Sequence, residues 1–230
     1  AIKSAGGKGA IYGVATLLEK LVGVDYLAKD FYTLTPSADI RIPKMHVAES
    51  PAFRFRQTFS YSNNDNTYRD WMRLHDHSEV FANDMWVHTF DRLLPSSVYG
   101  KAHPEYYSFI SGERRPGNHS QWCLSNPEIF EIVANRIDSI FKANPGRNTI
   151  SVSQNDGNDT YCQCPECKKV NEYEGSPAGC YIRFLNRLAE RFPDKQISTL
   201  AYLFTMHPPK HVKPLPNVNI MLCDIDCKRE

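Results

Sequence analysis

The sequence has 230 residues, of which 41% are hydrophobic and 12% are aromatic, a composition typical of a chain with a packed core. Its 27 basic and 26 acidic side chains leave a formal net charge of +1 and form no block of like charge. This balance argues against nucleic acid or an anionic membrane as the main partner. No apolar run reaches the roughly 18 residues that span a bilayer, and the N-terminus lacks a signal-peptide pattern.

The first 50 residues predict a helix followed by turn-rich chain. Apolar residues recur at helical spacing from Ala10 to Val22, and Gly23 ends the pattern. The chain is then punctuated by prolines, and residues 40–42 alternate like a short strand. We place a domain boundary near residues 44–51.

From residue 53 onward, predicted strands alternate with connections. The strands are expected at residues 53–59, 85–90, 149–153, 197–204 and 218–223. Helices are expected at residues 67–75, at 126–143 with Asn126 as the N-cap, and after Ser176-Pro177. Four prolines predict an extended crossover before the last strand. This alternation predicts a parallel α/β sheet.

Polar side chains follow the third predicted strand. Gln154, Asn155 and Asp156 come directly after a β-branched run, and Gly157 with Asn158 ends the strand. Because α/β folds carry their chemistry at the carboxyl ends of parallel strands, this stretch is the first candidate for a functional site.

The chain has seven cysteines, and three of them lie within six residues. Cys162, Cys164 and Cys167 form a Cys-x-Cys-x-x-Cys array, which suits a structural metal such as zinc with a fourth ligand from Cys123, Cys180 or a histidine. Alternatively, a disulfide within the array or over a longer range would hold the loop after the third predicted strand in place. Free or redox-active thiols are the third interpretation.

Several phrases of the sequence resemble a known bacterial family. Ser-Val-Ser-Gln-Asn-Asp-Gly-Asn, Tyr-Cys-Gln-Cys-Pro-Glu-Cys, Glu-Gly-Ser-Pro-Ala-Gly and Pro-Pro-Lys-His-Val-Lys-Pro occur in this order. Together they resemble the family labelled domain of unknown function 4838. Residues 8–19 and 48–56 are similar to the junction in family 20 hexosaminidases and family 67 α-glucuronidases, where a small α/β domain leads into a TIM barrel.

This resemblance implies that residues 1–46 are the C-terminal part of an accessory α/β domain. Residues 47–230 would be the N-terminal part of a TIM-barrel domain, with five of its eight strands, so the chain is expected to be a fragment. The resemblance also implies a secreted or periplasmic protein that acts on glycans. It supplies no catalytic pair, because the hexosaminidase Asp-Glu pair has no counterpart at residues 202–205.

Glycoside hydrolysis generally needs two carboxyl groups that flank the scissile bond. Asp156 after the third strand, and Asp224 and Asp226 after the fifth, are the acids that a barrel would turn toward its C-terminal face. Alternatively, Asp156 caps its own Gly157 turn, and Asp226 is an exposed loop acid.

Other side chains near strand ends suit sugar recognition. His88 can bond a hydroxyl or assist proton transfer, and Gln154 and Asn155 are amides suited to hydroxyl groups. Aromatic rings can stack on sugar faces or belong to the core. The aromatic candidates are Trp86, Trp122 and Tyr202.

These observations predict a glycoside hydrolase that acts on a polysaccharide or glycan by carboxylate acid/base catalysis, without a catalytic cofactor. The alternative is a noncatalytic glycan-binding protein on the same fold. A metal-dependent hydrolase that uses the cysteine array is the weaker alternative, since thiolates alone rarely leave an open position on zinc.

Overall fold

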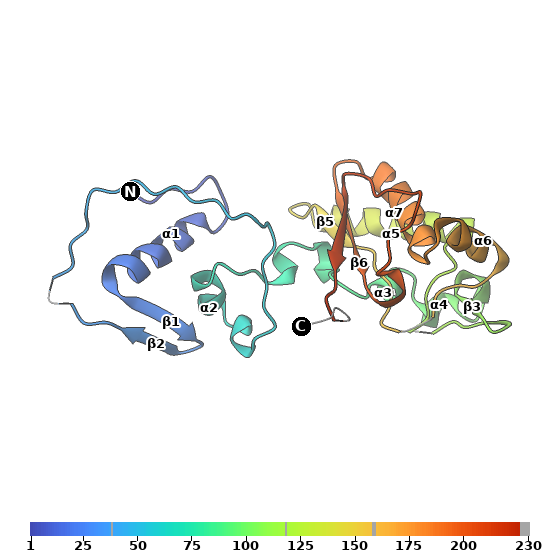
Figure 1. Cartoon of the computed structure of the whole chain (residues 1–230), viewed down its shortest axis with the longest axis horizontal. Coiled ribbons are helices and arrows are strands. Elements are labelled where there is room, and N and C mark those ends of the chain that lie inside the picture. Colours follow the sequence, from blue (N-terminus) through green and yellow to red (C-terminus); the bar gives the residue numbers. More distant parts are fainter. Residues whose placement is uncertain (38, 118, 158–159, 226–230) are drawn as a thin grey trace. The chain divides into compact units, whose positions relative to one another are not determined.

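The computed structural model describes residues 1–37, 39–117, 119–157 and 160–225, and the chain divides into two compact units (Figure 1). The first unit comprises residues 1–80 and the second residues 81–230. The boundary expected near residues 44–51 falls inside the first unit. No helix in the described part of the chain is long and apolar enough to cross a membrane.

The first unit contains a helix and an antiparallel hairpin. Helix α1 spans Gly9–Leu17 and continues as a π-helical turn, η1, over Leu18–Val22. Gly23 closes it in the left-handed region at φ 75°, which a residue with a Cβ adopts only at a cost. Strands β1 (Val24–Ala28) and β2 (Phe31–Leu34) follow. This hairpin lies in the turn-rich stretch, whereas residues 40–42 form no strand.

The rest of the first unit is made of short helices. They are η2 (Tyr61–Asn64), α2 (Asn66–Trp71) and η3 (His77–Glu79). Arg73 ends the predicted helix early because its φ is 56°. Its guanidinium donates to both carboxylate oxygens of Glu19, at 2.7 and 2.8 Å, and to the Thr16 hydroxyl at 2.7 Å. This fork joins α1 to the residues that follow α2.

The second unit is organised around a parallel sheet of three strands in the order β5-β6-β7. They span Thr149–Ser151, Gln196–Ala201 and Val218–Leu222. Ser151 pairs with Ser198, and Thr199 pairs with Ile220. The expected third, fourth and fifth strands are therefore present and parallel.

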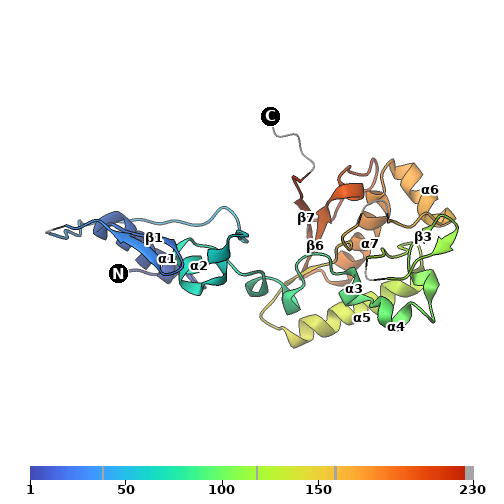
Figure 2. The same ribbon diagram turned by 90° about the horizontal axis from the view of Figure 1, so that it is seen from below.

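Two long helices lie in this unit (Figure 2), and both bury apolar side chains. Helix α5 spans Pro127–Ala143, and Asn126 caps it by accepting the N–H of Glu128 at 2.9 Å. Helix α7 spans Ala178–Arg191 and contacts β6, β7 and α5. Their apolar side chains meet a ring cluster in the core, where Phe90 and Trp122 stack with centroids 3.7 Å apart.

The remaining elements of the second unit are short, apart from α6 (Pro165–Glu174), which the sequence did not predict. The helices are η4 (Ala82–Asp84), α3 (Phe90–Leu93), α4 (Ser96–Tyr99), η5 (Pro104–Tyr106) and η6 (Leu203–Thr205). Strands β3 (Phe109–Ile110) and β4 (Glu113–Arg114) form a small hairpin.

The prediction that the five strands belong to a TIM barrel is wrong. The described strands make three separate small sheets, and residues 53–59 and 85–90 are not strands. Residues 81–90 do run beside β5, with a parallel bridge from Phe81 to Thr149. However, Asn83, Asp84 and His88 have φ of 49°, 58° and 51°, which breaks the extended geometry that a ladder requires.

Residues 53–59 alternate polar and apolar side chains without a ladder of hydrogen bonds. Phe53 and Phe59 are exposed, and the His75 N–H donates to the Arg56 carbonyl at 2.7 Å, while the Arg56 N–H donates to the His75 ring at 3.3 Å. The alternation of polar and apolar residues therefore did not identify a strand here, because a strand also needs a neighbouring strand to pair with.

The proline-rich crossover between η6 and β7 is anchored by one buried carboxylate. Glu174 is fully buried and accepts the N–H groups of His211 and Val212 at 2.9 and 3.0 Å. Arg183 donates to its other oxygen. Burial alone would raise the pKa of Glu174, but Arg183 and the two N–H groups outweigh burial and lower this pKa to about 2.

We expect Glu174→Gln to destabilise the protein by about 1–3 kcal/mol, because charge-assisted hydrogen bonds of a buried group are lost. The contribution of Glu174 is complete above its usual pKa of 4.5 and disappears as the pH falls toward about 2. Urea unfolding as a function of pH measures this, with Glu172→Gln as the exposed control. Equal stability of both variants across this range would contradict the anchoring role.

Candidate metal centre and the neighbouring polar site

Four cysteine thiols converge in the core of the second unit. Cys123, Cys162, Cys164 and Cys167 are all buried, and their sulfur atoms all lie within 4.8 Å of one another. Cys123 directly follows Trp122, which bridges to Tyr107. The other three thiols come from the Cys-x-Cys-x-x-Cys array, in which Cys164 is the N-cap of α6 and Cys167 lies in its first turn.

The spacing of these sulfur atoms fits four ligands around one ion. The Cys123 and Cys164 sulfurs are 3.6 Å apart, whereas a tetrahedral zinc with bonds of about 2.3 Å separates its sulfurs by roughly 3.8 Å. A disulfide would bring two sulfurs to about 2.05 Å. All six cysteines in the described part of the chain are free, so the disulfide interpretation of the array is not supported there.

Cys180, the other candidate for the fourth ligand, is not part of this group. Its buried thiol donates to the backbone carbonyl of Cys167 at 3.5 Å. The structure therefore selects Cys123 from the two cysteines that the sequence offered.

Donors around the cluster favour thiolate over thiol. The backbone N–H of Phe109 and the guanidinium of Arg114 donate to the Cys162 sulfur at 3.3 and 3.7 Å. The Ser125 hydroxyl accepts from the Cys167 thiol at 3.2 Å and lies 3.4 and 3.5 Å from the Cys123 and Cys164 sulfurs. The N-terminus of α6 adds a partial positive charge near Cys164 and Cys167.

Three of the four thiols are also joined by hydrogen bonds that change their pKa values. Hydrogen bonds from Cys162 and Cys167 lower the pKa of Cys123, and donating to Cys123 raises the pKa of both partners. These hydrogen bonds therefore favour the thiolate form of Cys123 over that of Cys162 and Cys167. A dication that binds all four would replace the protons of these hydrogen bonds.

A glutamine connects this centre to the end of β5. The Gln121 side chain donates to the Asn155 carbonyl at 2.8 Å and to the Thr160 hydroxyl at 3.0 Å, and it accepts the Asn155 N–H at 3.0 Å. Gln121 and Thr160 each lie two residues before a cysteine of the cluster. The same two segments are therefore joined by side-chain hydrogen bonds and by converging thiols.

The two amides predicted to bind substrate hold the loop in place. Asn155 is buried, accepts the N–H of Asp91 at 3.1 Å and donates to the Ser120 carbonyl at 2.7 Å. Gln154 is fully buried and donates to the Thr205 hydroxyl at 2.7 Å. Its side-chain oxygen has no hydrogen-bond partner among the described residues.

Three predicted site residues do come together at the carboxyl ends of β5 and β6. The Tyr202 hydroxyl donates to the exposed carboxylate of Asp156 at 3.0 Å. The rings of Tyr202 and His88 lie with centroids 5.8 Å apart. His88 Nδ1 lies 2.8 Å from the Gln154 carbonyl, which can only accept, so Nδ1 carries a proton and Nε2 is the acceptor in the neutral ring.

The other predicted site residues differ in burial. Trp122 is 1% exposed and stacks on Phe90, so it belongs to the core. Trp86 is half-buried in the loop before His88, and Asp224 is exposed after β7. Asp226 lies outside the described residues.

Sequence reasoning missed Gln121, Ser125 and Arg114. Each contacts a side chain roughly 40 residues away in the sequence, so no local spacing identifies it. The one usable signal was position, because Gln121 and Ser125 flank the isolated Cys123.

In the folded Cys227→Ser variant, we expect thiol titration to find one reactive cysteine. Cys223 is the partly exposed thiol among the six that the structure describes, and the other five are buried. Denaturation in the presence of a chelator should release all six. Fewer than six would reveal a disulfide, and several fast native thiols would show that the cluster is open to solvent.

Comparison with known proteins gives one match. No curated protein and no solved structure matches the chain. The sequence model of one family matches residues 26–230, which include the thiol cluster and the polar edge of the sheet. The chain therefore belongs to the family described as Domain of unknown function (DUF4838).

Proposed function

We propose that the polar edge formed by Asp156, Tyr202 and His88 binds a carbohydrate, and that the protein is a glycoside hydrolase. The observation that carries this proposal is the bond of 3.0 Å from the Tyr202 hydroxyl to Asp156, beside the His88 ring. A carboxylate and a phenol at the carboxyl ends of two adjacent parallel strands, with an imidazole beside them, supply acid/base groups and an aromatic surface.

Each residue has a distinct part in this proposal. Asp156 is exposed and serves as the base or nucleophile, and Tyr202 orients its carboxylate through the hydroxyl. The Gln154 carbonyl fixes the His88 ring, so that Nε2 is the ring nitrogen left for a sugar hydroxyl or a proton. Asn155 and Gln121 position the chain just before Asp156.

A noncatalytic glycan-binding protein is the second candidate, and one observation favours it. Most glycoside hydrolases use two carboxyl groups, whereas among the described residues a hydrogen bond brings one carboxylate, that of Asp156, to Tyr202. A site with a single carboxylate can bind sugars without cleaving them.

We also propose that the four thiols bind one structural Zn²⁺. Cys123, Cys162, Cys164 and Cys167 form a buried set of soft ligands at a separation that suits this ion. Four thiolates complete a tetrahedral shell and leave no position for a reacting water. The cluster therefore favours a structural metal over a metal-dependent hydrolase.

Turnover of a polysaccharide panel tests the carbohydrate proposal. We expect Asp156→Asn to lower kcat by at least about 10²-fold, the usual contribution of a positioned acid or base. Tyr202→Phe should lower kcat less, and the exposed control Asp194→Asn should leave it unchanged. Binding of a polysaccharide without turnover by the unmodified protein would support the second candidate, and neither binding nor turnover would refute both.

Elemental analysis and melting curves test the zinc proposal. We expect about one zinc ion per chain, lost in the Cys164→Ser variant together with roughly 5–10 °C of melting temperature. The matched control, Cys223→Ser, changes a thiol outside the cluster and should retain both the ion and the melting temperature. A Cys164→Ser variant that melts like the unmodified protein as purified, or an unmodified protein purified without zinc, would contradict this role.

A further inference from the structure

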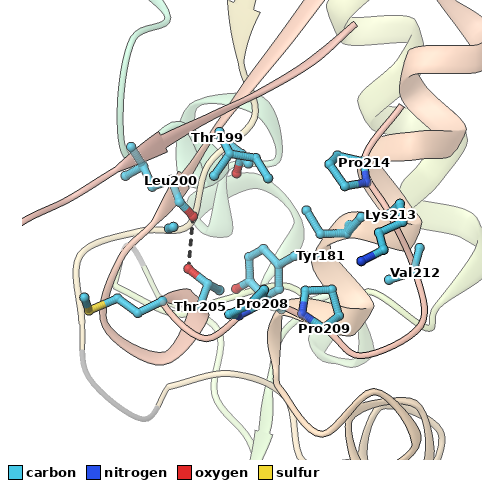
Figure 3. A pocket seen from close by; sticks show the side chains of 14 residues that line it. Tyr181, Thr199, Leu200, Thr205, Pro208, Pro209, Val212, Lys213 and Pro214 are labelled. Carbon is cyan, nitrogen blue, oxygen red and sulfur yellow. Dashed lines mark hydrogen bonds between the residues drawn. The ribbon is translucent and has the colours of Figure 1, made fainter. Parts of the chain in front are cut away.

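A cavity lies on the side of the sheet that α7 covers, and Asp156, Tyr202 and His88 are not among the residues that line it. Its volume is about 290 Å³, and it is lined by residues of α7, β6, β7 and the proline-rich crossover (Figure 3). Apolar side chains make most of its wall. They include Ile182, Leu200, Pro208, Pro209, Val212 and Ile220.

The crossover wall of this cavity is held in a fixed conformation. Beyond the two N–H groups that Glu174 accepts, the Ser176 hydroxyl donates to the His207 carbonyl at 2.5 Å. Asn186 donates to the Lys213 carbonyl at 2.8 Å and accepts the Leu215 N–H at 3.0 Å. Side chains of α6, the α6–α7 turn and α7 thus fix the crossover on both sides of the cavity, which makes the cavity preformed.

Two buried hydroxyl groups in the lining lack a partner among the described residues. Thr199 is 2% exposed and Tyr181 is 4% exposed, and neither hydroxyl makes a hydrogen bond there. By contrast, the Thr205 hydroxyl in the same wall donates to the Leu200 carbonyl at 3.0 Å (Figure 3). Because an unpaired buried hydroxyl is costly, the two groups indicate a polar ligand atom.

One cation completes the lining. Lys213 is exposed on the crossover, and no acidic side chain in the described part of the chain lines this cavity. Its ammonium group therefore gives one wall a positive charge that other lining residues do not balance. Thr199 belongs to β6 and Lys213 to the crossover, so the two polar features come from different walls.

We propose that this cavity binds a small phenolic carboxylate. The aromatic ring would contact the apolar and proline side chains, the carboxylate would pair with Lys213, and the phenol would bond the hydroxyls of Thr199 and Tyr181. A single benzene ring with one short acidic substituent suits a volume at the lower end of ligand pockets, which begin at about 300 Å³.

Calorimetry with 4-hydroxyphenylacetate tests this assignment. Lys213→Met should weaken binding about two- to fivefold, the value of a partly exposed ion pair, and remove the preference over 4-hydroxyphenylacetamide. Lys210→Met changes a lysine on the same crossover that does not line the cavity, and it should bind as the unmodified protein does.

Thr199→Val separates recognition from folding. This variant should weaken binding of 4-hydroxyphenylacetate about two- to tenfold and leave binding of phenylacetate unchanged. Since it removes an unpaired buried hydroxyl, its melting temperature should not fall. Absence of saturable binding by the unmodified protein, or equal effects of Lys213→Met and Lys210→Met, would overturn the proposal.

Discussion

Four buried thiols that share one small volume are the constraint on which the second unit depends. Their sulfurs lie within 4.8 Å of one another in the core, where an unpaired thiolate is costly. The cluster joins the segment around Cys123 to the loop and helix that follow β5. In a metal-free protein hydrogen bonds connect the thiols, whereas a bound dication would join all four with bonds of much greater strength.

This junction positions the residues that the carbohydrate proposal uses. Gln121 and Thr160, each two residues before a cysteine, bond to one another, and Gln121 also holds both backbone groups of Asn155. Asp156 follows directly and extends beyond the buried strand to meet Tyr202. One hydrogen-bond network therefore connects the four-thiol cluster to the carboxyl ends of β5 and β6, where the proposed chemistry takes place.

Local signals predicted the parts of the fold that local physics determines. Asn126-Pro127 and an apolar stripe identified α5, and β-branched runs with turn residues located β5, β6 and β7. The cysteine spacing identified three of the four clustered thiols, and Cys123 was one of the candidates for the fourth.

Features that depend on distant partners were not predictable in the same way. The segment at residues 85–90 has the composition of a strand, but the left-handed backbone of His88 interrupts it and points the ring at Tyr202 instead. Gln154 and Asn155 looked like sugar ligands because they are amides after a strand, whereas their bonds to Thr205, Asp91 and Ser120 hold the loop. Alternation at residues 53–59 could not reveal that no neighbouring strand pairs with it.

X-ray absorption at the zinc edge of the purified protein tests the central claim most directly. Four sulfur neighbours at about 2.3 Å would establish that the thiol cluster is a closed structural site. A shell containing oxygen or nitrogen ligands, or zinc that leaves the protein on simple dialysis, would contradict the claim that the four cysteines hold this part of the fold together.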